Sequence, residues 1–170
     1  NAITTGTQNT AVGHGTMQYA TTASNNTTIG SGSLYSLISG EKNSVMGLSA
    51  GAGLTTGSSN IAIGYTALGA ATSSDGNIAI GTAAIYNSTG SNNIGIGTQA
   101  IVNNTSGILN TAVGYQGLFN NNSGQQNVAF GNSSLFNNTS GTGNSAVGSF
   151  ALYHNTIGTY NTAIGYQAGY

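Results

Sequence analysis

The sequence predicts an all-β protein, a parallel β-roll or β-solenoid of ten rungs, in which each rung is one 17-residue repeat. A five-residue motif that begins with Asn and ends with Gly recurs ten times, at a step of 17 residues except for one step of 16. A unit of this length cannot bury its own apolar face, so it must stack on its neighbours. The ten copies begin at Asn9, Asn26, Asn43, Asn60, Asn77, Asn93, Asn110, Asn127, Asn144 and Asn161.

Two absences favour stacked rungs over hairpins. No Asn-Gly dipeptide occurs, although both residues are abundant and Asn-Gly is the strongest short-range signal for a hairpin. No Pro occurs either, and Pro would interrupt a ladder of backbone hydrogen bonds. With rungs ~4.8 Å apart, ten of them predict a rod on the order of 45–50 Å long.

The motif itself is expected to form a short strand. With its Asn counted as position 1, position 5 is Gly in all ten copies, position 4 is always apolar and position 3 is mostly Ala. Side chains alternate between the two faces of a strand, so positions 2 and 4 share a bulky β-branched face and positions 1, 3 and 5 share a small one. We expect this strand to be packed on both sides, with a close approach or a positive φ at the Gly column.

The remainder of each unit predicts a bend and a turn. Leu or Ile usually occupies position 9 and an aromatic residue often follows at position 10, which predicts a second short strand. A polar run with Gly at position 15 then predicts a turn. Stacking makes each position a column, and an Asn column can bond its amides to the rungs above and below. The one 16-residue repeat lacks a residue, and this deletion falls in residues 87–92, where we expect a turn. A turn can lose one residue without shifting the register of the strands.

Charged residues are nearly absent, at 2% of the chain against roughly 25% in ordinary domains. They are Glu41, Lys42 and Asp75. So few cations exclude nucleic-acid binding and attraction to a membrane through a basic face. The absence of Cys excludes a disulfide framework and a thiolate metal site. No apolar run approaches the ~18 residues of a membrane-spanning segment, so we expect no direct membrane insertion.

Residues 1–170 form one repeat array. Residues 1–8 fit positions 10–17 of a preceding rung, and the chain stops at position 10 of its last rung. Neither end carries a polar cap of the kind that solenoids need. We expect this array to be a window of a longer fibrous protein.

No pattern points to catalysis. Glu41 lies at position 16 and Asp75 matches that position only loosely, two rungs away. A carboxylate pair for glycoside hydrolysis stands ~5–9.5 Å apart, and no His lies beside either acid in the repeat frame. Calcium-binding β-rolls repeat Asp in their turns, which this chain does not. We therefore expect no catalytic, cofactor-binding or metal site, and a protein that is not an enzyme.

The repeat resembles two related groups of proteins. The stretch from Asn60 to Ala67 resembles the head repeats of trimeric autotransporter adhesins, and Asn-Thr-Ala-Ile-Gly-Tyr-Gln-Ala at 161–168 is similar to repeat arrays of phage tail fibres and bacterial surface fibres. The resemblance covers the whole chain. It implies a left-handed parallel β-roll with three chains about one axis, and an extracellular location on a bacterial surface or a phage virion. The polar turn is longer than in the usual adhesin head.

Energetics independently favour an oligomer. Each rung carries about three or four apolar side chains worth ~1.5–3 kcal/mol each when buried, whereas ordering its residues costs at least ~1 kcal/mol per residue. Packing the Ala and aromatic columns against other copies of the chain would add buried apolar surface and help to offset the cost of ordering each rung. We expect a homotrimer with its small-residue columns on a shared axis.

The expected function is structural. We expect the shaft or head of a fibrous adhesin or phage tail fibre, a rigid and nearly neutral spacer that presents a binding tip to a host-cell receptor or glycan. One alternative is a ligand-binding solenoid for glycans or ice that uses its Thr, Asn and Tyr columns. The other is an extracellular filament of solenoids stacked end to end.

The candidate for a binding face is the Thr column at position 13. Regular hydroxyls at ladder spacing could order water, although Ser and Thr before Gly also stabilise turns. The Tyr columns could instead stack on sugars. The candidate residues are Thr4, Thr21, Thr55, Thr72, Thr89, Thr105, Thr139 and Thr156.

Overall fold

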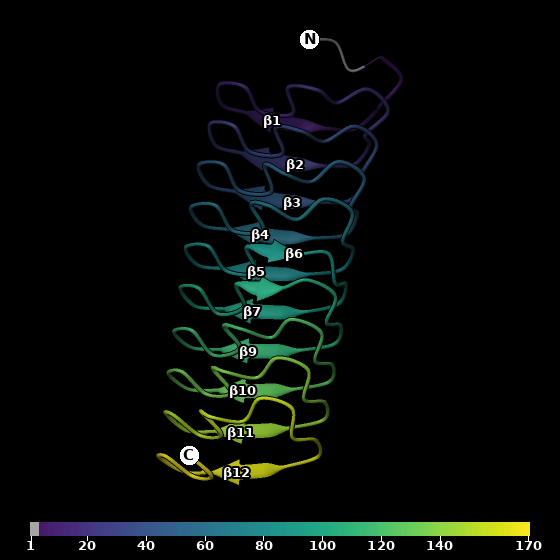
Figure 1. The fold of residues 1–170 in the computed structure, drawn as a ribbon. Coiled ribbons are helices and arrows are strands. Elements are labelled where there is room, and N and C mark those ends of the chain that lie inside the picture. The colour runs from purple at the N-terminus through teal and green to yellow at the C-terminus, as the bar shows by residue number, and fades with distance from the viewer. Residues whose placement is uncertain (1–3) are drawn as a thin grey trace.

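A single stack of parallel strands makes up the fold. The computed structural model describes residues 4–170, and within them it contains strands and turns but no helix, so none of these residues forms an apolar helix long enough to cross a membrane. Ten strands lie one above another along a rod, from the N-terminal to the C-terminal end (Figure 1). They are β1 (Thr10–Val12), β2 (Thr27–Ile29), β3 (Ser44–Met46), β4 (Ile61–Ile63), β5 (Ile78–Ile80), β7 (Ile94–Ile96), β9 (Thr111–Val113), β10 (Val128–Phe130), β11 (Ser145–Val147) and β12 (Thr162–Ile164).

The register of the sheet follows the repeat throughout, which confirms the predicted β-solenoid. Each strand pairs in parallel with the next, and equal repeat positions lie side by side, as in the pair Ala129 and Ala146. Ten strands enclose nine complete turns of the coil. Across the shorter repeat, Ile78 still pairs with Ile94, so the deletion in residues 87–92 leaves the strand register unchanged, as predicted.

The predicted second strand at positions 9 and 10 is wrong. Residues such as Leu68 and Leu135 at position 9 have φ values of 54° and 51°, in the left-handed region rather than the extended one. This conformation turns the chain sharply, so that the position-9 side chain points back into the coil. In residues 4–170, a second strand exists only beside the deletion, at positions 11 and 12, where β6 (Asn87–Ser88) pairs with β8 (Asn103–Asn104).

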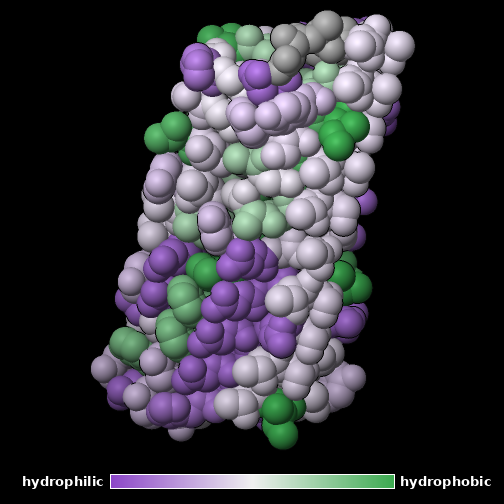
Figure 2. Space-filling model, turned by 45° about the horizontal axis from the view of Figure 1, so that its top comes forward, coloured by the Kyte–Doolittle hydropathy of each residue, from purple (hydrophilic) through white to green (hydrophobic). Residues whose placement is uncertain are grey.

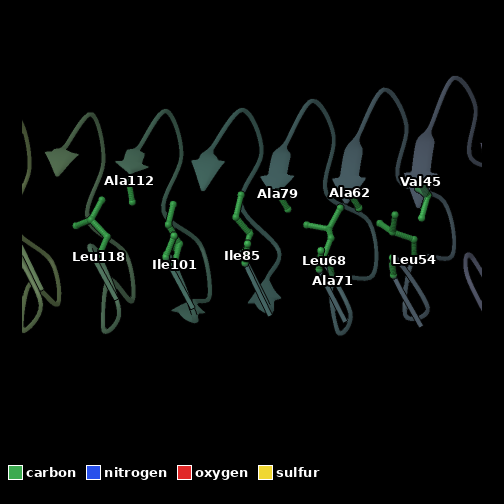
Figure 3. Packing of buried hydrophobic residues seen from close by; sticks show 14 of the residues in the cluster. Val45, Leu54, Ala62, Leu68, Ala71, Ala79, Ile85, Ile101, Ala112 and Leu118 are labelled. Carbon is green, nitrogen blue, oxygen red and sulfur yellow. The ribbon is translucent and has the colours of Figure 1, made fainter. Parts of the chain in front are cut away.

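The core lies inside the coil, and positions 3 and 9 form its two main columns. From the second rung onward, Ala side chains at position 3 of the strands face Leu and Ile side chains at position 9, and both columns are almost completely buried. Ala side chains at position 8 and the Ala and Leu side chains at position 12 of the first rungs are buried with them. Figure 3 shows Ala62, Ala79 and Ala112 pointing from their strands toward the column that contains Leu68, Ile85 and Leu118. The coil is too thin for large residues on both sides, which explains why position 3 is small.

This packing corrects the expectation that the strand is packed on both sides. Within one chain, positions 2 and 4 point outward and the small face points into the core, as the alternating burial of β4 shows. The side chains of Val12 and Phe130 are 55% and 53% exposed. The small-residue column therefore has no free surface with which to line an axis shared by several chains.

The Asn column at position 1 forms the predicted ladder of amides inside the coil. The Asn110 Nδ2 donates to Oδ1 of Asn93 at 3.1 Å and to the carbonyl oxygen of Gly124 at 2.9 Å. Its Oδ1 accepts from the backbone N–H of Asn127 at 3.0 Å and from the Asn127 Nδ2 at 3.2 Å. Every hydrogen-bonding site of this buried amide is used, which is the condition under which a buried polar group is tolerated.

A second buried Asn ladder runs through the C-terminal half only. Position 12 carries Ala or Leu in the first rungs, then Ser88, and from Asn104 onward it carries Asn. The Asn104 Nδ2 donates to the Ser88 Oγ at 3.1 Å, and the Asn121 Nδ2 donates to the Asn104 Oδ1 at 2.9 Å. Ser88 ends the ladder by donating its own hydroxyl to the carbonyl of Gly90 at 3.3 Å.

The Gly column at position 5 forms the corner after each strand. Gly64 has a φ of 131°, a conformation that side chains rarely adopt, and a Cβ placed on it would lie 2.6 Å from the carbonyl oxygen of Gly81. Both predicted reasons for Gly, the positive φ and the close approach of the next rung, therefore hold at this corner.

Candidate functional site

The outward face of the ten-stranded sheet is the most distinctive surface of the protein. We call it the outer sheet face and define it as positions 2 and 4 of the ten strands. Position 4 is apolar in every rung, and position 2 is apolar in the middle of the rod and mostly Thr or Ser toward its ends. The position-4 residues are Val12, Ile29, Met46, Ile63, Ile80, Ile96, Val113, Phe130, Val147 and Ile164.

The size of this face exceeds what scattered surface residues provide. Nine rung steps of ~4.8 Å and a strand about 10 Å long give an area of roughly 400–450 Å². Within this footprint, position 4 of every rung and position 2 of the middle rungs form a contiguous apolar patch, and the largest apolar patch on a single chain is often functional. The view in Figure 2, by contrast, shows hydrophobic side chains as separate spots and a band of hydrophilic side chains over the C-terminal half.

A shallow hollow interrupts the outer sheet face where Ser44 replaces a larger residue. It has a volume of about 100 Å³ and is lined by apolar and hydroxyl side chains of three neighbouring rungs. Pockets for small molecules usually measure ~300–1,000 Å³. The hollow therefore suits a single inserted side chain better than a ligand. Its lining residues are Thr27, Ile29, Ser44, Val45, Met46 and Ile63.

The predicted Thr column at position 13 is aligned along the surface, and six of its eight hydroxyls donate hydrogen bonds within the chain. The Thr21 Oγ1 donates to the carbonyl of Ile38 at 3.3 Å, Thr55 to Thr72 at 3.0 Å, and Thr139 to Thr156 at 3.0 Å. Thr4, Thr89 and Thr105 make the same bond to the following rung. These hydroxyl hydrogens are already used, which favours the turn-stabilising role over ice binding.

The two carboxylates lie in one column, so the expectation that Asp75 matches position 16 only loosely is wrong. The backbone N–H of Glu41 donates to the Ser58 Oγ at 3.0 Å, and the backbone N–H of Ser58 donates to the Asp75 Oδ1 at 2.7 Å. Ser58 thus separates the acids by two rung steps, about 10 Å. The Asp75 carboxylate thus accepts a hydrogen bond from the backbone of the preceding rung. In the same way, the Ser91 Oγ accepts a hydrogen bond from the backbone N–H of Asp75 at 3.0 Å.

No further group joins these acids. In residues 4–170 no three His, Cys, Asp or Glu side chains gather as a metal site would require. Glu41 and Asp75 are both exposed, and each is surrounded by hydroxyl-bearing turns rather than by a closed cavity.

The aromatic residues at position 10 stack on one another in the C-terminal half. The ring centroids of Phe119 and Phe136 are 5.1 Å apart, those of Phe136 and Tyr153 are 5.2 Å apart, and those of Tyr153 and Tyr170 are 5.5 Å apart. The planes of neighbouring rings lie within 16° of parallel. Stacking occupies the faces of the inner rings, so this ladder presents mainly ring edges to its surroundings.

A different aromatic pair lies near the N-terminal end. Tyr19 and Tyr35 pack edge to face with ring centroids 5.1 Å apart, and their hydroxyl oxygens are 3.4 Å apart. The hydrogen bond with Tyr19, and then the charge that Tyr19 itself can carry, raise the pKa of Tyr35 above its ordinary value. In the nearby turn, Leu37 is buried in the core and Ile38 is exposed, so only Ile38 is available for the local contact considered from the sequence.

Three comparisons with known proteins add no relative. No family model, no curated protein sequence and no solved structure matches this chain. The function is therefore inferred from the outer sheet face and from the resemblance of the repeat motif.

Proposed function

We propose that this chain is the rigid shaft or head of a fibrous surface adhesin or a phage tail fibre, outside the cell. The observation that carries the proposal is the outer sheet face, an exposed apolar strip that runs the length of a stack held in strict register. Like a spacer, the stack has a repeated cross-section, buried amide ladders that resist register slip, and almost no charge to make its stability depend on salt.

The proposed fibre is a homotrimer whose chains pack through the outer sheet face. Ile61, Ile63, Ile78, Ile80, Ile94 and Ile96 form the centre of that face, and the hydroxyl side chains at position 2 toward both ends provide a more polar border. An apolar centre with a polar rim is the usual anatomy of a protein interface. The number three comes from the resemblance of the motif to trimeric adhesin heads.

This assembly replaces the small-residue axis expected from the sequence. The Ala column is buried against Leu and Ile within each chain, whereas the columns at positions 2 and 4 are exposed and form a continuous apolar surface for a neighbour. Covering a side chain of this type stabilises an assembly by up to ~1.5–3 kcal/mol when it starts fully exposed, and by proportionately less here.

Charged substitutions on the outer sheet face test the proposal. We expect Ile63→Asp and Ile96→Asp, both at position 4, to convert the trimer to a folded monomer because a carboxylate cannot be buried there unpaired. Thr72→Asp, on an exposed turn of the same rod, is the matched control and should remain trimeric. Sedimentation gives the mass and circular dichroism reports the fold. A trimer that survives both Ile substitutions would contradict assembly through this face.

A further inference from the structure

The exposed side chains at position 6 form a second column that neither the core nor the outer sheet face uses. This position follows the Gly corner of each rung, and its carbonyl accepts a hydrogen bond from the position-7 N–H of the next rung, as Tyr65 does from Ala83 at 2.9 Å and Tyr115 from Ser133 at 2.9 Å. These bonds keep the column straight along the rod. Its members are His14, Ser31, Leu48, Tyr65, Thr82, Thr98, Tyr115, Asn132, Ser149 and Tyr166.

Tyrosines occur in this column at every third rung of its C-terminal part. Tyr65, Tyr115 and Tyr166 lie in rungs four, seven and ten, and their side chains are 55%, 48% and 71% exposed. Three rung steps of ~4.8 Å place neighbouring tyrosines about 14 Å apart. In the part of the chain that the structure describes, neither Tyr65 nor Tyr115 stacks on another ring, unlike the tyrosines of the position-10 ladder.

The residues between the tyrosines are short and polar. Thr82 and Thr98 separate Tyr65 from Tyr115, and Asn132 and Ser149 separate Tyr115 from Tyr166. Each offers a hydroxyl or an amide that both donates and accepts hydrogen bonds. The column thus alternates one apolar ring with two neutral hydrogen-bonding groups over six rung steps, a span of about 29 Å.

We propose that the position-6 column binds an extended, neutral polysaccharide that lies along the rod. Sugar rings present apolar C–H faces, which stack on exposed aromatic rings, and hydroxyl groups, which the intervening Thr, Asn and Ser side chains can bond. The regular spacing matches a repeating ligand rather than a single small molecule. With Lys42 as the only cation in the chain, an acidic polysaccharide would find no compensating charge.

This inference goes beyond the proposed spacer role and stands on a different column. The fibre proposal depends on positions 2 and 4 and is tested by mass, whereas this site depends on position 6 and is tested by binding. A chain that is trimeric but binds no glycan would leave the fibre proposal intact, and a monomer that binds one would leave the site intact.

Binding to a panel of polysaccharides tests the site. The protein is mixed with cellulose, chitin, β-mannan and starch as neutral probes, and with alginate as an acidic probe. We expect it to bind at least one neutral polymer, and to bind that polymer far more tightly than the disaccharide of the same sugar. Alanine at Tyr65, Tyr115 or Tyr166 should weaken binding about tenfold each, and the triple variant should lose it.

Two further variants separate stacking from a general loss of structure. Phe at the same three positions keeps the rings and should retain most of the binding. Tyr160→Ala removes a tyrosine that is 81% exposed but lies at position 17, and it should bind as well as the parent. Binding to no neutral polymer, a preference for alginate, equal affinity for the disaccharide, or binding unchanged in the triple Ala variant would each overturn the proposal.

Discussion

The backbone of Gly95 lies directly against the side chain of Ile85, and a Cβ placed on Gly95 would be 2.6 Å from the Ile85 Cγ1. Gly95 is the only Gly at position 3 of the ten strands, where the others carry Ala, Thr or Val. The Cγ1 and Cδ1 atoms of Ile85, in the preceding rung, fill the volume that an Ala methyl would occupy at position 95. The core is therefore complementary between neighbouring rungs.

We predict that Gly95→Ala destabilises the protein by about 1–3 kcal/mol, because the added methyl overpacks the site. Ile85→Leu should reduce this loss in the double variant, since an Ala column facing Leu is the arrangement in neighbouring rungs. Denaturant unfolding of the two single variants and the double variant measures the coupling. Additive effects of the two substitutions would show that the contact between Gly95 and Ile85 does not determine the residue at position 95.

The amide ladder predicts a large effect of a change that adds no volume. Asn110→Asp replaces two donated hydrogen bonds with a buried charge that faces the Asn93 Oδ1 and the Gly124 carbonyl. We expect a loss of about 3–5 kcal/mol near neutral pH. Asn122→Asp in an exposed turn is the control and should change stability by less than about 0.5 kcal/mol.

The same variant has a predictable dependence on pH. Burial raises the folded-state pKa of a carboxyl above its unfolded value, so the folded state gains stability relative to the unfolded state as pH falls through the folded-state pKa. The stability deficit of Asn110→Asp should therefore shrink in acid. A deficit that stays constant from neutral to acidic pH would mean that the carboxylate is solvated and the ladder is open at that rung.

An unpartnered hydroxyl predicts a stabilising substitution. The Ser74 Oγ is buried and has no hydrogen-bond partner among the residues that the structure describes, at a position where most rungs carry Gly. We expect Ser74→Ala to raise the free energy of unfolding by about 1 kcal/mol, since a buried hydroxyl without a partner is costly. The matched change Ser134→Ala removes a hydroxyl that donates to the carbonyl of Gly131 at 3.2 Å, and it should not stabilise the protein. Thermal unfolding of both variants checks the difference.

The pair of tyrosines near the N-terminal end predicts a titration effect. Because the hydrogen bond with Tyr19 raises the pKa of Tyr35, the contribution of this pair to stability is present below the ordinary Tyr pKa and is lost as pH rises through the raised value. Tyr19→Phe should return the Tyr35 pKa to the ordinary range. Nuclear magnetic resonance of the ring carbon that bears the hydroxyl resolves this one tyrosine, and an unchanged midpoint would count against the bond.

Much of the fold followed from the period of the sequence. Identical spacing places identical residues in one column, so the parallel register, the ladder at Asn110 and the Gly corner at Gly64 could all be predicted. Which face of each strand points into the coil could not be predicted, because the alternation of side chains defines two faces without saying which one is inside. The bulky side chains of Ile61 and Ile63 suggested that they belong to a core. Inside the coil, however, residues such as Leu68 fill most of the space from the side opposite the strand, and the strand face that meets them has room only for Ala.

The remaining errors have local causes. The left-handed conformation at Leu68 and Ile85 carries no composition signal, since neither residue type favours it, and these residues were therefore predicted as strand. The alignment of Glu41 with Asp75 was missed from the sequence, although both are the sixteenth residue of their repeat. The three-rung spacing of the position-6 tyrosines can be read from the sequence, but their exposure follows only from the placement of the corner at position 5.

Assembly through the outer sheet face predicts the mass of the protein in solution. A single chain is 16.8 kDa, so three copies give 3 × 16.8 = 50.4 kDa. We predict that sedimentation equilibrium finds the trimer, that mild denaturant dissociates it without a separate loss of strand structure, and that Ile63→Asp prevents its formation. A folded, soluble monomer of 16.8 kDa at all concentrations would rule out assembly through the outer sheet face, because this face would then be stable in water with nothing covering it.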